Sequence, residues 1–133
     1  MNKVLCIFII IIFSNTSIAN NHNVRIFGKG GADCSKYVQQ YQLSSKEFFK
    51  WIDDKNRAFT QDEYILFKNF LTYMEWARGF ASGNNVFNSD ENGDIYDMPD
   101  MRILAIEFND YCNQNPSEPF FYAVRKKLSK YKK

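Results

Sequence analysis

Residues 60–84 read TQDEYILFKNFLTYMEWARGFASGN in this chain of 133 residues. Apolar side chains recur in the stretch at spacings of three and four residues, which is the period of an α-helix with a buried face. Thr60 and Glu63 form a capping box, in which each residue satisfies a free backbone N–H group of the other. Gly83 followed by Asn84 is a usual left-handed stop. The stretch therefore predicts a long central helix that ends near Gly83.

Shorter helical patterns flank this central stretch. We expect one helix over residues 34–42 and another that begins with a capping box at Ser44 to Glu47 and ends near residues 53–56. A further helix is predicted from about residue 97 through Cys112, with Ile103, Ile106 and Tyr111 marking its face and Leu104 and Phe108 beside them. The last one is predicted over residues 120–130, with Phe121, Val124 and Leu128 pointing inward.

These patterns predict an all-α fold, in which four or five helices form a small bundle over residues 34–133. Residues 20–33 carry little periodicity and are expected to form a loose lead-in. The glycines at positions 28, 30 and 31 lack the spacing of a phosphate-binding loop, so we interpret them as a flexible linker.

The N-terminus has the pattern of an export signal. Lys3 precedes an apolar run over residues 4–13, and small residues occupy positions 17 and 19. The run is shorter than the about 20 residues that a membrane-spanning helix needs. We expect cleavage after Ala19, so that residues 1–19 are a signal peptide and the mature chain reaches the periplasm or is secreted, without a transmembrane segment.

Cleavage after Ala19 leaves two cysteines, Cys34 and Cys112, because Cys6 departs with the signal peptide. Two cysteines in an exported chain predict one disulfide bond. They lie far apart in the sequence, unlike the CxxC pair of redox enzymes, so we interpret the bond as structural. Closing so long a loop stabilises a domain by about 4 kcal/mol in the chain-entropy model.

Charge and histidine content exclude several classes of function. The chain has 17 Lys and Arg against 15 Asp and Glu, too small an excess to attract nucleic acid. His22, the one histidine, disfavours a histidine-built metal site or a catalytic triad. We therefore expect no catalytic residue, cofactor or enzyme activity. A small hydrolase using Glu63 and Glu75 is a minor alternative, because capping and solvated helix faces explain such carboxylates better.

Residues 88–95 are similar to the front of a calcium loop. Oxygen-bearing side chains occupy alternate positions, as a hard cation requires, and a glycine follows the third of them. Pro99 stands where such a loop places a bidentate Glu. We expect a solvated turn and no metal, and keep as the alternative a calcium site made by Asn88, Asp90, Asn92 and Asp94.

Aromatic residues are numerous, with 13 Phe, 8 Tyr and 2 Trp. A core of this size does not hide them all comfortably, and surface Tyr and Trp favour protein recognition. Gly79 and Gly83 form a small-residue face suited to close helix packing. We expect another protein as the partner, bound through a candidate surface made by Trp76, Gly79, Phe80, Gly83 and Asn84.

Three sequence blocks resemble a largely uncharacterised group of small exported bacterial helical proteins. The blocks are GGADCSKY at residues 30–37, EWARGFASGN at 75–84 and DYCNQNP at 110–116. The group's pattern runs G-x-x-x-C, then W-x-x-G-[FY]-x-S-G-x-N, then Y-C-x-x-N-P before a final helix. The group is similar in size, helicity and cysteine plan to the HdeA/HdeB acid chaperones and to Tai-type periplasmic immunity proteins.

This resemblance implies an exported helical fold and carries over no catalytic residue. Two functions follow as expectations. One is a non-catalytic protein-binding module, such as an inhibitor or immunity protein. The other is an acid-stress chaperone of the HdeA kind, which exposes apolar surface when its carboxylates are protonated.

Overall fold

The computed structural model of the chain describes residues 26–54, 58–88 and 95–133, so the predicted signal peptide lies outside the described residues. Over these ranges the protein is all-α, as predicted, and contains no strand. Four α-helices are flanked by two short 3-10 helices: η1 (Gly28–Gly31), α1 (Cys34–Asp53), α2 (Gln61–Asn88), α3 (Met101–Gln114), α4 (Phe120–Leu128) and η2 (Ser129–Tyr131). None of the described helices is both long and apolar enough to cross a membrane.

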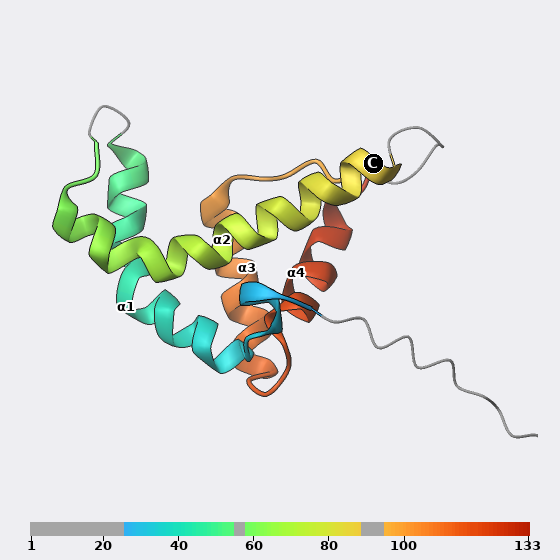
Figure 1. Cartoon of the computed structure of the whole chain (residues 1–133), viewed down its shortest axis with the longest axis horizontal. Helices are drawn as coiled ribbons and strands as arrows, with labels where there is room; N and C mark the ends of the chain where they lie inside the picture. Colours follow the sequence, from blue (N-terminus) through green and yellow to red (C-terminus); the bar gives the residue numbers. More distant parts are fainter. Residues whose placement is uncertain (1–25, 55–57, 89–94) are drawn as a thin grey trace, which may run out of the picture.

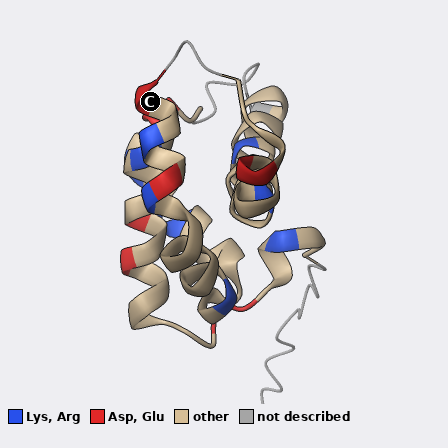
Figure 2. Ribbon diagram, turned by 90° about the vertical axis from the view of Figure 1, so that its left-hand side faces the viewer, with Lys and Arg blue, Asp and Glu red and all other residues tan. Residues whose placement is uncertain are grey.

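Helix α2 extends across the whole molecule, with α1 toward one end and α4 toward the other (Figure 1). Its core-facing side chains recur at three and four residues, as predicted: Phe67, Phe70, Met74, Ala77 and Ala81 are all buried. In the views drawn, basic and acidic residues are interspersed along the helices rather than gathered by sign (Figure 2). The burial of apolar side chains, rather than a separation of charges, therefore holds α2 in the fold.

The predicted capping box at the start of α2 is confirmed. The backbone N–H of Glu63 donates to Thr60 Oγ1 at 3.2 Å, and that of Thr60 donates to Glu63 Oε2 at 3.0 Å. The predicted end of this helix is wrong, since α2 continues through Gly83 to Asn88. Gly83 is not in the left-handed conformation, a positive φ being found at Gly28. A glycine commonly ends a helix by adopting the left-handed conformation, and Gly83 does not adopt it.

Tyr37 connects α1 to the three other helices at the centre of the core. Its ring lies 6.1 Å from Phe70 of α2, 6.4 Å from Phe108 of α3 and 4.7 Å from Phe120 of α4, measured between ring centroids. Its hydroxyl donates to the carbonyl of Ala105 at 2.9 Å. Burial raises the pKa of Tyr37 well above its ordinary value, so the side chain stays neutral and satisfied in the interior.

The predicted disulfide bond joins Cys34, in the first turn of α1, to Cys112, in the last turn of α3, with the two Cα atoms 4.8 Å apart. Backbone hydrogen bonds reinforce the same corner. The N–H of Cys34 donates to the carbonyl of Glu118, and the N–H of Phe120 donates to the carbonyl of Ala32, each at 2.8 Å. The segment that enters α1 is thereby bound to the segment that enters α4.

The two helices predicted over residues 34–56 are one helix, α1, whose axis changes direction along its length (Figure 1). Ser44 does not cap a second helix, because its hydroxyl donates to the carbonyl of Leu66 on α2 at 2.9 Å. Both Ser44 and Ser45 are buried. The serines therefore belong to the contact between α1 and α2.

The predicted buried face of α3 is wrong in part: Leu104 and Phe108, expected beside it, are buried, but two residues expected to mark it are not. Ile103 and Ile106 are 47% and 42% exposed. The residues that face the core are Leu104, Ala105, Phe108 and Cys112. This orientation places Cys112 against Cys34.

Replacing both bonded cysteines by alanine (Cys34→Ala with Cys112→Ala) should lower the free energy of unfolding by about 2–5 kcal/mol, because the unfolded chain regains the freedom of a long closed loop. Urea unfolding followed by circular dichroism measures the difference. Reducing the wild-type protein should give a similar loss, whereas reductant should leave the double variant unchanged. Equal stability of the oxidised wild type and the double variant would contradict a structural role for the bond.

Candidate functional site

Two of the predicted docking residues, Trp76 and Phe80, are part of the packing between α2 and α4. Their rings are stacked with centroids 5.9 Å apart. Phe121 of α4 meets both rings edge-on, at 6.5 Å from Trp76 and 5.6 Å from Phe80. Both side chains are half-buried against the core. Their contacts therefore stabilise the packing of α2 against α4.

Helix η1 closes over the indole of Trp76. The Trp76 Nε1–H donates to the carbonyl of Phe27 at 3.0 Å. A Cβ atom on Gly30 would lie 2.0 Å from the Trp76 ring, and Gly28 has a φ of +68°. Residues 28–31 are therefore not the expected flexible linker, since their glycines allow the backbone to contact the indole directly.

Gly79 and Gly83 do not make the close helix packing that their spacing predicts. A Cβ atom built on either residue would meet no described atom within 4 Å. Asn84 is half-buried beside them. Of the five predicted docking residues, Trp76 and Phe80 thus pack against α4, whereas Gly79 and Gly83 have open space around them.

Several predicted residues lie outside the described part of the chain or serve local structure. His22 and the calcium-loop residues Asp90, Asn92 and Asp94 lie outside it, as does the side chain of Asn88. Among the described residues, no group of three His, Cys, Asp or Glu side chains could hold a metal ion. Glu63 belongs to the capping box, and Glu75 pairs with Arg78 at 3.3 Å.

An apolar cavity of about 450 Å³ opens between the second half of α1, the middle of α2 and the start of α3. Its size and composition are typical of binding pockets, which combine apolar walls with few polar groups. The polar groups are Glu75, Arg78 and Asp100. The apolar walls are formed by Phe48, Trp51, Ile52, Phe59, Leu71 and Met101.

The cavity continues along α2 in both directions. A hollow of about 260 Å³ toward α3 shares Arg78 and Met101 with it. Another hollow of about 450 Å³ toward the start of α2 shares Leu71 and Glu75. We call the three together the apolar groove. Five of the seven α2 residues that line it follow one helical stripe, with Asn69 and Thr72 beside it: Tyr64, Lys68, Leu71, Glu75 and Arg78.

Stacked aromatic side chains form one wall of the apolar groove. The rings of Trp51 and Phe59 lie 3.8 Å apart with an interplanar angle of 14°. Phe48 lies behind them, fully buried, with its ring 5.8 Å from Phe67 and 5.2 Å from Phe70. The wall is thus anchored in the core and presents flat aromatic surface at its rim.

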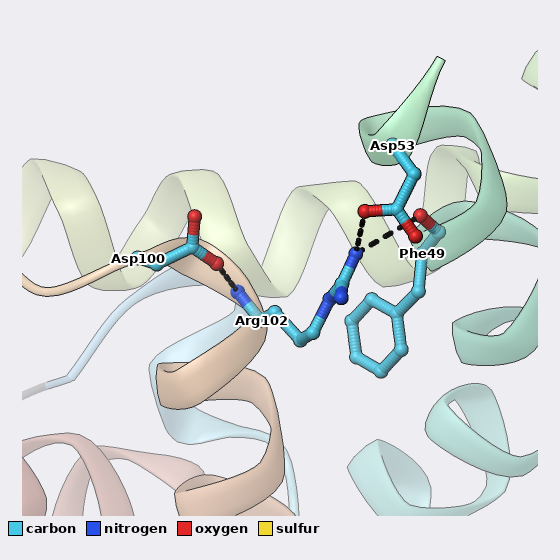
Figure 3. Close-up of polar contacts among 4 residues, drawn as sticks. All are labelled: Phe49, Asp53, Asp100 and Arg102. Carbon is cyan, nitrogen blue, oxygen red and sulfur yellow. Dashed lines mark hydrogen bonds and ion pairs between the residues drawn. The ribbon is translucent and has the colours of Figure 1, made fainter. Parts of the chain in front are cut away.

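Arg102 connects the α1 and α3 walls of the groove (Figure 3). Its Nη2 donates to the carbonyl of Phe49 at 3.2 Å and to Asp53 Oδ1, and its guanidinium lies 5.3 Å from the centroid of the Phe49 ring. Asp100 caps α3 by accepting the backbone N–H of Arg102 at 2.7 Å. These contacts hold the second half of α1 against the start of α3 and so set the width of the groove.

Comparison with known proteins found no relative of this chain: no family model matches it, and neither a curated protein nor a solved structure does. A function is therefore assigned from the apolar groove and the residues around it.

Gly30→Ala should destabilise the protein by about 1–3 kcal/mol, because the added methyl overlaps the Trp76 ring and forces it out of place. Gly79→Ala is the matched control. It adds the same methyl group in open space on a helix, so we expect it to raise stability by about 0.5–1 kcal/mol. Thermal unfolding with Trp fluorescence compares the two. Equal effects of both substitutions would show that Trp76 does not rest on Gly30.

Proposed function

We propose that the protein is an exported, non-catalytic module that binds another protein, and that its apolar groove receives the partner's apolar side chains. The apolar groove is the observation that carries this proposal. It joins three hollows along one stripe of α2. The disulfide bond supports the export part of the proposal, since such bonds persist in oxidising compartments.

The dimensions of the groove suit a peptide segment better than a compact small molecule. From Tyr64 to Arg78 the stripe covers about 20 Å at the α-helical rise of 1.5 Å per residue. An amphipathic helix can lay its apolar face in a groove of this kind. Lys68, Glu75, Arg78 and Asp100 place charges of both signs along the groove, so matching charges on the partner would fix its register.

Leu71→Asp tests the proposal, because a carboxylate in the groove would lose hydration without gaining a partner. Affinity capture of the exported protein should recover one protein in a stoichiometric amount, and Leu71→Asp should weaken direct binding of that protein at least tenfold. Leu43→Asp is the matched control, since Leu43 is 62% exposed and lies outside the groove. Circular dichroism verifies that both variants fold.

The control variant should bind as the wild type does. Recovery of no stoichiometric partner would contradict the proposal, and so would binding that Leu71→Asp and Leu43→Asp weaken equally.

An acid-stress chaperone is the second candidate, and the carboxylate contacts between elements favour it. Asp53 of α1 accepts from Arg102 of α3, Glu107 of α3 accepts from Lys130 of η2 at 2.8 Å, and Glu118 accepts from Tyr111. Carboxylates in general are mostly neutral at about pH 2–3, and loss of the negative charge would weaken all three contacts. The Phe49 ring, which the Arg102 guanidinium covers, would then be uncovered.

This second function predicts that the protein prevents aggregation of a client protein at about pH 2–3 but not at pH 7. Asp53→Asn imitates the protonated carboxyl, so it should increase the binding of a hydrophobic dye at neutral pH. Light scattering of the client and dye fluorescence are the measurements. A client that aggregates as fast with the protein as without it at low pH would rule the chaperone out.

A further inference from the structure

We propose that a second cavity, formed by α3, α4 and the chain around Tyr96, binds a small phosphorylated ligand of about the size of a sugar phosphate. The cavity has a volume of about 400 Å³, within the range of about 300–1,000 Å³ typical of small-molecule sites. None of the described residues that line it also lines the apolar groove. We call it the tyrosine pocket, after Tyr96, Tyr111 and Tyr122.

The walls of the tyrosine pocket are held in place by the fold itself. Tyr96 is 8% exposed, and its backbone exchanges two hydrogen bonds with the side-chain amide of Asn85, at 2.9 Å and 2.6 Å. Tyr96 also forms a β-bridge with Lys132, whose Nζ lies 5.9 Å from the centroid of the Tyr96 ring. A pocket preformed in this way binds without a large ordering cost.

Tyr111 supplies a second fixed wall. Its hydroxyl donates to Glu118 Oε2, and this hydrogen bond raises the pKa of Tyr111 to about 12. The phenol is therefore neutral at physiological pH, and it engages the nearby carboxylate of Glu118. No carboxylate is among the described residues that line the pocket.

Basic side chains line this pocket without any acidic one among its described lining residues. Arg125 and Lys126 both line the cavity, and neither forms an ion pair within the described residues. Other cations in the structure do have carboxylate partners: Lys50, Arg78, Arg102, Lys130 and Lys133. The dipole of α4 accounts for basic residues in its last turn, but not for three tyrosines that converge beside them.

The lining chemistry points to a phosphate on a ring-bearing molecule. Arg125 offers a planar fork of N–H donors and Lys126 offers an ammonium group, and both suit phosphate oxygens. The Tyr122 hydroxyl, on a side chain 44% exposed, supplies a further donor. Tyrosine rings provide apolar faces against which a sugar ring can pack. A free phosphate ion would leave most of the 400 Å³ unfilled.

The experiment titrates the oxidised, isotope-labelled protein with glucose 6-phosphate and follows the backbone amide signals by NMR. We expect saturable shifts centred on Tyr96, Tyr122 and Arg125, weaker ones with inorganic phosphate and none with glucose. Binding should weaken as salt is raised, because the contacts are charge-assisted. Vesicles containing an anionic phospholipid form a separate arm, which distinguishes a soluble ligand from a lipid headgroup.

Arg125→Gln with Lys126→Gln should weaken binding of glucose 6-phosphate at least tenfold. Lys36→Gln with Lys46→Gln is the matched control, since it removes the same charge from exposed positions on α1, and it should change affinity less than twofold. Tyr122→Phe, which removes only a hydroxyl, should weaken binding several-fold. All variants alter exposed side chains, so their amide spectra should remain those of a folded protein.

Three results would overturn the proposal. They are an absence of saturable shifts with glucose 6-phosphate, an equal loss of affinity in the pocket variant and in its control, and binding confined to phospholipid vesicles. This test of the tyrosine pocket does not depend on whether a protein partner occupies the apolar groove.

Discussion

The disulfide bond between Cys34 and Cys112 fixes the first turn of α1 against the last turn of α3, and the rest of the fold is arranged around that corner. Tyr37 follows Cys34 by one helical turn, so the bond also determines where the central ring of the core lies. Backbone hydrogen bonds from Cys34 and Ser35 to the chain before α4 bring the last helix to the same place. A domain this small buries proportionally little surface, so a covalent corner contributes a large part of its stability.

Local sequence signals predicted the helices, whereas contacts distant in sequence determined how the helices meet. The capping box at Thr60 and the apolar stripe of α2 lie within one segment, and both were predictable. The exposure of Ile103 and Ile106 depends on how α3 packs against the other helices, so the apolar pattern of α3 alone could not reveal it. Gly30 was predicted to be part of a linker, because Trp76, whose ring leaves no room for a side chain at this position, is distant in sequence.

The residues that shape both cavities were missed for the same reason. Arg102 acts on Phe49 and Asp53, which belong to another helix, and no spacing rule relates them. Asn85 holds Tyr96 through its side-chain amide. The number of aromatic residues predicted that some would be exposed, but it did not predict which ones. Exposed recognition was predicted for Trp76 and Phe80, yet these rings pack against α4, and a cleft lined by Trp51 and Phe59 offers aromatic surface elsewhere.

The two cavities differ in the contacts that hold their walls. The groove uses the second half of α1, which lies beyond the covalent corner and is held by noncovalent contacts from Ser44, Phe48 and Arg102. Its width can therefore change when those contacts shift, as suits a surface that accommodates protein side chains. The tyrosine pocket is built on α3 and α4, where Tyr111 adjoins the bonded Cys112 and Tyr96 is held by the side chain of Asn85. A rigid pocket gains affinity for a small ligand by avoiding ordering costs, so these fixed walls suit the small ligand proposed for the pocket.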